Sequence, residues 1–197
     1  MPITLTPTTR ILFIGDSITD CERRDDTEQI GNGYVRLIRD HLLATSPATA
    51  PIVINRGIRG NKMPDLQKRW QRDVLDETPD VLSVCIGIND VWHGLLPNRQ
   101  GCEIDRFIEG YRDVLKRTRD ALPRCALVLC EPSVIWPPVH DEGNAKLAPY
   151  VRAVQIIAAA FDAECRLERA LRVVNPGVDD AAVMGARGAT RLALALQ

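Results

Sequence analysis

Short apolar runs alternate along most of the chain with longer segments in which apolar and polar residues mix. Each run is bounded by Gly, Pro or Asn, and this length and punctuation predict buried β-strands. The predicted strands are Arg10–Ile14, Ile52–Asn55, Val81–Ile86 and Ala126–Glu131.

Between these runs, apolar residues recur at the spacing of an α-helix, which predicts four amphipathic helices. The four sets are Tyr34, Leu37, Ile38 and Leu42; Met63, Leu66, Trp70 and Val74; Ile104, Phe107, Ile108, Tyr111, Val114, Leu115 and Leu122; and Tyr150, Val151, Val154, Ile157, Ala158 and Phe161. Pro64 suits the first turn of the second helix, and the fourth is expected to begin behind Pro149, because proline is tolerated where a helix starts.

Strands and helices that alternate in this way indicate an α/β protein with a mostly parallel sheet and helices on both faces. A chain of 197 residues can fold as one domain with a sizeable core. No repeat, low-complexity tract or linker interrupts it, so we expect residues 1–197 to form a single domain.

Composition and charge are those of an ordinary globular protein. Hydrophobic residues make up 45%, charged residues 26%, and the formal net charge is −1. This balance gives no electrostatic reason to expect nucleic acid or an anionic membrane as a partner. Basic pairs at Arg23-Arg24 and Lys68-Arg69 have acidic neighbours and are expected to lie on solvated faces.

The segment Met1–Pro7 has neither the basic start nor the apolar core of a signal peptide, and no stretch approaches the length needed to span a bilayer. None of the six cysteines forms a Cys-x-x-Cys pair. Three of them, Cys85, Cys125 and Cys130, lie in or beside apolar runs, where a free thiol behaves as a small hydrophobe. We therefore expect a reduced, cytoplasmic protein.

Polar residues of an unusual kind follow three of the four predicted strands. The first strand ends in Gly15-Asp16-Ser17, the second leads into Asn55–Asn61, and the third ends in Gly87-Ile88-Asn89-Asp90. In open α/β sheets, ligands bind in the crevice beyond the carboxyl ends of the strands. These three segments are therefore expected to form one site.

The residue types at these ends fit acyl transfer through a serine. A serine hydroxyl becomes a nucleophile when it is positioned and a base takes its proton. The oxyanion that forms needs fixed hydrogen-bond donors, which the backbone N–H of Ser17, a glycine after the second strand and the amide of Asn89 could supply. Neither a dinucleotide-binding nor a P-loop glycine pattern occurs, and Asp16, Asp90 and His93 share no recognised metal-ligand spacing, so no cofactor or metal is expected.

Gly-Asp-Ser after the first strand, Asn-x-Gly-x-x-Gly after the second and Gly-x-Asn-Asp after the third resemble the first three sequence blocks of the SGNH (GDSL-type) hydrolases. The resemblance covers roughly residues 10–170. It implies a three-layer, flavodoxin-like fold of about five strands, a carboxylic ester hydrolase activity on a small ester, and no cofactor. It also implies Ser17 as the nucleophile, Gly60 and Asn89 in the oxyanion hole, and Asp16 and Asp90 as loop braces.

Two features depart from that family's pattern. Arg59 stands where such sequences often carry a small residue, and it is either a surface side chain or a group that favours an anionic substrate. The family's last block, Asp-x-x-His, supplies the general base, but the three histidines of this chain are His41, His93 and His140. One register of the terminal segment puts Pro176 at the acid and Asp179 at the base; the other puts Asp180 at the acid and Val183 at the base.

Three interpretations of the missing histidine stay open. The segment from about residue 171 is degenerate or out of frame, which leaves an impaired esterase or a non-catalytic ligand-binding protein. Alternatively, His140 or His93 substitutes for the base. Finally, Asp179 or Asp180 acts as the base, although a carboxylate is a weak base at neutral pH unless burial raises its pKa. The oligomeric state is not readable from the sequence.

Overall fold

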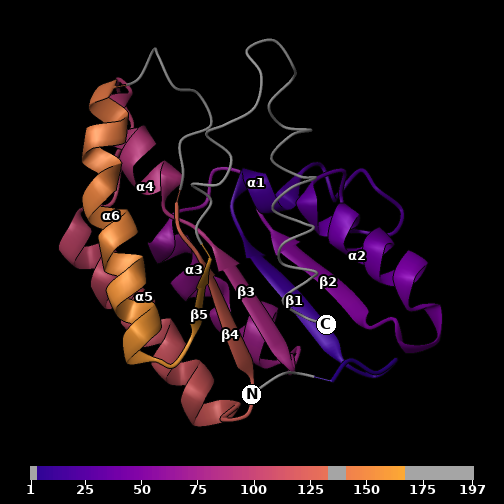
Figure 1. Ribbon diagram of the computed structural model, residues 1–197. Helices are drawn as coiled ribbons and strands as arrows, with labels where there is room; N and C mark the ends of the chain where they lie inside the picture. The colour runs from indigo at the N-terminus through magenta and orange to yellow at the C-terminus, as the bar shows by residue number, and fades with distance from the viewer. Residues whose placement is uncertain (1–3, 133–140, 167–197) are drawn as a thin grey trace.

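A computed structural model describes residues 4–132 and 141–166 of the chain. Its five strands form one parallel sheet in the order β2-β1-β3-β4-β5 (Figure 1). The strands are β1 (Arg10–Gly15), β2 (Ile52–Gly57), β3 (Val81–Cys85), β4 (Ala126–Cys130) and β5 (Glu164–Arg166). This strand order is that of flavodoxin-like sheets, so the fold class expected from the sequence is confirmed.

The helices α2, α3, α5 and α6 connect successive strands, and the short α1 and α4 follow β1 and β3 directly. Their bounds are α1 (Ser17–Asp20), α2 (Tyr34–Thr45), α3 (Met63–Trp70), α4 (Ile88–Trp92), α5 (Ile104–Ala121) and α6 (Asp141–Ala160). A π-helical segment, Gln71–Leu75, extends α3, and 3₁₀ turns occupy Pro47–Thr49 and His93–Leu95. No helix in the described part of the chain is long and apolar enough to cross a membrane.

The core lies in two layers, one on each face of the sheet. Alternate residues of β1 point to opposite sides, as the pleat of a strand requires. Leu12 and Ile14 pack in the larger layer with α3, α5 and α6, whereas Ile11 and Phe13 pack with α2. Right-handed crossovers explain this division, because the chain moves from β1 to β2 in one direction and from β2 through β5 in the other.

Three details differ from the sequence predictions. β2 is an edge strand, and the prediction that Ile52–Asn55 is buried was wrong for most of it. Ile52 is 43% exposed, Val53 and Ile54 are half-buried, and only Asn55 is buried. Leu37 was assigned to the core face of α2 but is 39% exposed. Helix α6 was expected to begin behind Pro149, but it begins eight residues earlier, at Asp141, and Pro149 lies inside it.

The other helix predictions agree closely with the structure. Met63, Leu66, Trp70 and Val74 are all fully buried, and Pro64 occupies the first turn of α3. Periodic apolar positions therefore located the elements well. They failed where a strand lies at the edge of the sheet or where a proline is accommodated inside a helix.

Candidate active site

The three polar strand ends meet at one edge of the sheet. Gly15, the last residue of β1, pairs in register with Gly57 of β2 and with Cys85 of β3. Strand order reverses between β1 and β3, and such a switch point opens a crevice at the carboxyl ends of the strands. The segments that carry Ser17, Gly60 and Asn89 therefore start from adjacent positions along this edge (Figure 1).

Ser17 is the first residue of α1 and is exposed. Asp16 caps the helix: its Oδ1 accepts the N–H of Ile18 at 3.0 Å, and only 1% of the residue is exposed. Gly15 permits the close approach of β3 at this point, since a Cβ there would lie 2.2 Å from the carbonyl oxygen of Cys85. The serine is thus held on a short turn between a strand and a helix, with its side chain toward solvent.

The loop after β2 is fastened to the loop after β1. The N–H of Ile58 donates to the Gly15 carbonyl at 3.1 Å, and the N–H of Arg59 donates to Asp20 Oδ2 at 2.9 Å. Gly60 has a φ of +78°, a left-handed conformation that favours glycine, and the space where a Cβ would project is open. Gly60 can therefore present its backbone to the crevice without obstruction.

Asn55, at 3% exposure, is the internal brace of the same loops. Its Nδ2 donates to the carbonyls of Thr19 at 2.6 Å and Ile30 at 2.7 Å. Its Oδ1 accepts the N–H of Gly57 at 2.8 Å. One amide thus satisfies three backbone groups that would otherwise be buried without partners, which explains why the loop after β2 begins with asparagine.

Asn89 lies in α4, directly after β3, and is half-buried. Its Nδ2 donates to the carbonyl of Asn61 at 3.1 Å, which ties α4 to the loop that contains Gly60. A primary amide has two N–H groups, so one remains for a ligand. Gly87, with a φ of +132° and Pro132 packed against it, makes the turn from β3 into α4.

Asp90 is 2% exposed, and its Oδ1 accepts the N–H of Met63 at 3.0 Å, at the start of α3. Burial raises the pKa of this carboxyl to about 6, although the hydrogen bond from Met63 lowers it. The Cys102 thiol lies beside it, and burial together with the Asp90 charge raises the thiol pKa to about 12. Asp90 thus joins the starts of α3 and α4.

Arg69 is a structural residue that the sequence interpretation missed. Its guanidinium donates to the Gly15 carbonyl at 3.1 Å, the Arg56 carbonyl at 2.7 Å and Asn61 Oδ1 at 2.8 Å, and it pairs with Asp73 at 2.7 Å. Burial lowers the pKa of Arg69, and the opposing effect of the Asp73 carboxylate is smaller, so the pKa stays below its usual value. One side chain therefore contacts the ends of β1 and β2 and the Gly60 loop.

The expectation that both basic pairs lie on solvated faces was wrong for one member of each. Arg69 is 9% exposed and Arg23 is 8% exposed, while Arg24 and Lys68 face solvent. Arg23 donates from Nε to the Gly57 carbonyl at 2.7 Å. The sequence carries one signal that Arg69 is buried and paired: Asp73 follows it at the helical spacing of four, next to the apolar positions of α3.

His93, a proposed substitute base, lies in the 3₁₀ turn after α4, and its Cε1 is 4.0 Å from where a Gly60 Cβ would be. Arg99 Nη1 lies 3.4 Å from His93 Nε2. Because a guanidinium can only donate, Nε2 accepts and the proton of the neutral ring is on Nδ1. Burial, Arg99 and Lys62 lower the pKa of His93. His140, Asp179 and Asp180 lie outside the described residues.

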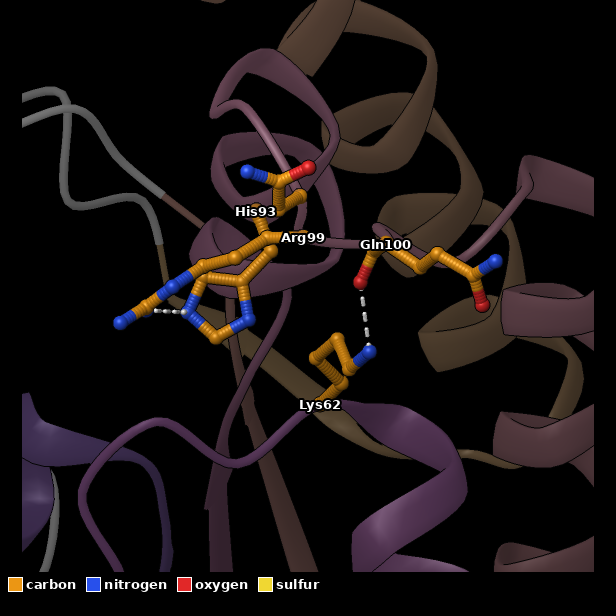
Figure 2. Close-up of a pocket in the computed structure, with 5 residues that line it drawn as sticks. Lys62, His93, Arg99 and Gln100 are labelled. Atoms are coloured by element: carbon orange, nitrogen blue, oxygen red, sulfur yellow. Dashed lines mark hydrogen bonds between the residues drawn. The ribbon is translucent and has the colours of Figure 1, made fainter.

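A shallow pocket of about 660 Å³ opens beside the Gly60 loop, lined by Lys62, His93, Asn98, Arg99 and Gln100 (Figure 2). Lys62 Nζ donates to the Gln100 carbonyl at 2.7 Å. In residues 4–132 and 141–166, no group of three or more His, Cys, Asp or Glu side chains is arranged to hold a metal ion.

Comparison with known proteins identifies relatives of this arrangement. A curated acetylxylan esterase from Geobacillus stearothermophilus is 36% identical over 157 residues, which is 76% of this chain and 71% of that protein. The crystal structure of an acetylxylan esterase from the same organism aligns with a TM-score of 0.81 and 28% identity, covering 98% of this chain and 94% of that one. Structures of catalytic mutants of that esterase have a serine, an aspartate or a histidine replaced by alanine.

A second solved structure, assigned as a GDSL-like lipase from Parabacteroides merdae, aligns over the full length of both chains with a TM-score of 0.84 and 30% identity. The model of the GDSL-like lipase/acylhydrolase family matches residues 13–193, further toward the C-terminus than the sequence blocks extend. Fold, strand-end segments and sequence agree, and this chain belongs to the GDSL-like lipase/acylhydrolase family.

Proposed function

We propose that this protein is a serine ester hydrolase in which Ser17 attacks the carbonyl carbon of a short-chain acyl ester. The observation that carries the proposal is the exposure of Ser17 on a braced turn at the same sheet edge as the Gly60 and Asn89 segments. Relatives with esterase activity and the match to the family add support.

The oxyanion donors in this proposal are the backbone N–H groups of Ser17 and Gly60 and the second N–H of the Asn89 amide. Attack by the serine hydroxyl places a negative charge on the former carbonyl oxygen, and each fixed donor stabilises it by about 3–4 kcal/mol. The bond from Asn89 to Asn61 supports this role, because it fixes the amide orientation before substrate arrives. Asp16 and Asp90 hold the turns that carry these donors.

The substrate class that we propose is an acetyl ester of a carbohydrate. Relatives with an acetylxylan esterase name support this choice. The reaction would pass through an acetyl-Ser17 intermediate, with the sugar hydroxyl as the first leaving group and acetate released by water in the second step.

We also propose that turnover is impaired, because no histidine follows His140 in the chain. A serine enzyme without its base retains about 10³–10⁴-fold catalysis over water through the oxyanion hole and substrate binding. His93 is a poor candidate for the base in the described conformation, since its Nε2 accepts from Arg99 and nearby cations lower its pKa. His140, Asp179 and Asp180 remain candidates.

The test is hydrolysis of 4-nitrophenyl acetate by the wild type and by Ser17→Ala. We expect slow hydrolysis that Ser17→Ala reduces at least tenfold, because the acyl-serine route is removed. Ser46→Ala, which removes a hydroxyl just beyond the C-terminus of α2, is the matched control and should behave as the wild type. Equal rates for the wild type and Ser17→Ala would exclude the catalytic role.

The alternative is a protein on the same fold that binds an acylated ligand without turnover, and the missing terminal histidine favours it. A fluorophosphonate reacts quickly with an activated serine and slowly with an ordinary one. Fast labelling of Ser17, located by mass spectrometry, would favour the hydrolase. Labelling no faster than that of free serine would favour the binding protein.

A further inference from the structure

The pocket beside the Gly60 loop is lined by basic side chains (Figure 2). Lys62 directly precedes α3, whereas His93 and Arg99 belong to the segment after α4. Figure 2 shows the Arg99 guanidinium at one edge of the His93 ring and the Lys62 ammonium turned toward the Gln100 carbonyl. Two separate parts of the chain thus bring positive charge to one depression.

Lys62 and Arg99 lie in no salt bridge within the described part of the chain, although the Lys62 charge acts on the buried Asp90 carboxyl and lowers its pKa. Lys62 Nζ donates to a carbonyl and Arg99 to an imidazole. The acid whose charge opposes these cations at His93 is Asp65, which accepts the backbone N–H of Lys62 at 3.1 Å and pairs with Lys68 at 3.4 Å.

The positive charges of Arg99 and Lys62 also affect the pKa of His93. Burial is the first cause of its lowering, and the charges of Arg99 and Lys62 add to it, while Asp65 opposes them. Cations disfavour a protonated imidazole, so Arg99 and Lys62 add to the lowering that burial produces. The ring is therefore a natural reporter of any anion that enters.

The pocket adjoins the proposed oxyanion donors. Lys62 follows Gly60 by two residues, and His93 follows Asn89 by four. His93 Cε1 lies 4.0 Å from where a Gly60 Cβ would be, and the Asn89 amide donates to the carbonyl of Asn61, the residue between Gly60 and Lys62 in the sequence. A substrate whose ester lies at Gly60 and Asn89 would therefore extend its remaining groups toward Lys62 and Arg99.

We propose that this basic pocket binds a carboxylate carried by the substrate near the scissile ester, so that the preferred substrate is an O-acetylated sugar acid. The inference rests on the proposed function for the position of the ester. Lys62 retains N–H groups beyond the one bonded to Gln100, and Arg99 has four N–H groups beyond the one at His93, so both can donate to a carboxylate. Asn98 and Gln100 complete the lining of the pocket.

Binding can be tested without turnover by proton NMR of the Ser17→Ala protein. The chain has three histidines, so the His93 Cε1–H resonance is assignable by comparison with His93→Gln. We expect sodium glucuronate to shift this resonance and raise the pKa of His93, because an anion favours the imidazolium, whereas glucose should do neither. Added salt should weaken the effect.

Variants identify the groups responsible. Arg99→Ala and Lys62→Ala should each raise the Kd for glucuronate about tenfold, as expected for the loss of one charge-assisted hydrogen bond. Lys116→Ala removes an exposed lysine near the other end of the strands, where it pairs with Asp120, and should leave the Kd unchanged. Circular dichroism should show that all three variants are folded. A shift that glucose reproduces, or that both pocket variants leave intact, would overturn the proposal.

A second measurement separates this inference from the proposed function. We expect the wild type to hydrolyse acetylated glucuronic acid with a higher kcat/KM than its uncharged methyl ester, and Arg99→Ala to reduce that ratio. Glucuronate binding without any ester hydrolysis would contradict the proposed enzyme activity and support the anion site. Hydrolysis of both esters at equal rates, with no His93 shift, would retain the enzyme and remove the anion site.

Discussion

Two glycines in the segment after β2 have different physical roles. A Cβ on Gly57 would lie 2.2 Å from the backbone nitrogen of Asp20 and 2.6 Å from the carbonyl carbon of Thr19, and neither backbone atom can move without displacing α1. Gly60 has the opposite character, because its surroundings are open and its φ of +78° is the constraint. The first glycine permits close packing and the second permits a left-handed turn.

These roles predict different stability losses. Gly57→Ala should lower the free energy of unfolding by about 3 kcal/mol, since an overpacked backbone contact must be relieved. Gly60→Ala should cost about 1–2 kcal/mol, the penalty of a left-handed residue with a side chain. Urea denaturation of both variants and the wild type measures the difference. Equal losses, or a larger loss for Gly60→Ala, would contradict the assignment.

Asp90 should make stability depend on pH. Its folded pKa of about 6 lies above the value of about 4 in an unfolded chain, so the folded protein binds the proton more tightly. The contribution of Asp90 to the free energy of unfolding is therefore greatest below about pH 4 and falls as the pH rises through about 6. Above that it stays constant.

Asp90→Asn removes the ionisation while keeping an oxygen that can accept from Met63. We expect the free energy of unfolding of the wild type, relative to Asp90→Asn, to fall by about 2 kcal/mol between pH 4 and pH 7. Urea denaturation across this range measures it. Asp105→Asn, in the first turn of α5, is the matched control for loss of one carboxylate. Parallel pH curves for wild type and Asp90→Asn would show that burial does not raise the pKa.

At the scale of elements, α3 links the strand ends through Arg69, whose guanidinium contacts the ends of β1 and β2 and the Gly60 loop. Asp73, four residues later, is buried and accepts from both Arg69 and Arg72. Burial alone would raise its pKa, but the bonds from Arg72 and Arg69 outweigh burial, and its pKa is lowered. The helix therefore carries a buried charge pair directly beneath the candidate site.

Removing the two arginines separately should give unequal losses. Arg69→Met should lower the free energy of unfolding by about 3 kcal/mol, because it leaves buried carbonyl groups and part of the Asp73 charge without partners. Arg72→Met removes the other partner of Asp73, but its side chain is 73% exposed, so its loss should stay below about 1 kcal/mol. Thermal or urea unfolding checks the order of the two, and a reversed order would contradict the bracing role.

At the scale of the whole molecule, the family match runs to residue 193 although the expected terminal histidine is absent. If Asp180 corresponds to the orienting acid, Val183→His restores a base beside it. We expect this variant to raise kcat for 4-nitrophenyl acetate about 100-fold, as general base catalysis commonly does. Asp179→His is the paired comparison, because it places a histidine at the base position of the other register, in which Pro176 stands at the acid position.

The gain must depend on the nucleophile. It should disappear when Ser17→Ala is added to Val183→His, because a restored base acts through the serine hydroxyl. An unchanged rate for Val183→His would count against the Asp180 register, and a gain for Asp179→His instead would favour the other register. The single-domain organisation of residues 1–197 and a cytoplasmic location stay predictions.

The sequence by itself determined the α/β class and the positions of four strands, and it predicted candidate site residues at three strand ends. These follow from local patterns, since apolar periodicity reports which face of an element is buried, and glycine and asparagine report turns. Local pattern pointed to Ser17, Asn89 and a glycine after the second strand, and the family resemblance singled out Gly60. The fold then placed their segments along one sheet edge.

Only the tertiary structure decided which polar side chains are buried and what they contact. Arg69, Arg23 and Asn55 look like surface or loop residues in the sequence, yet each holds backbone carbonyls of segments distant in the chain. The pocket of Lys62, His93 and Arg99 has the same origin, because it joins two loops that follow different strands. Burial and long-range pairing are properties of packing, and packing is not a local property of the sequence.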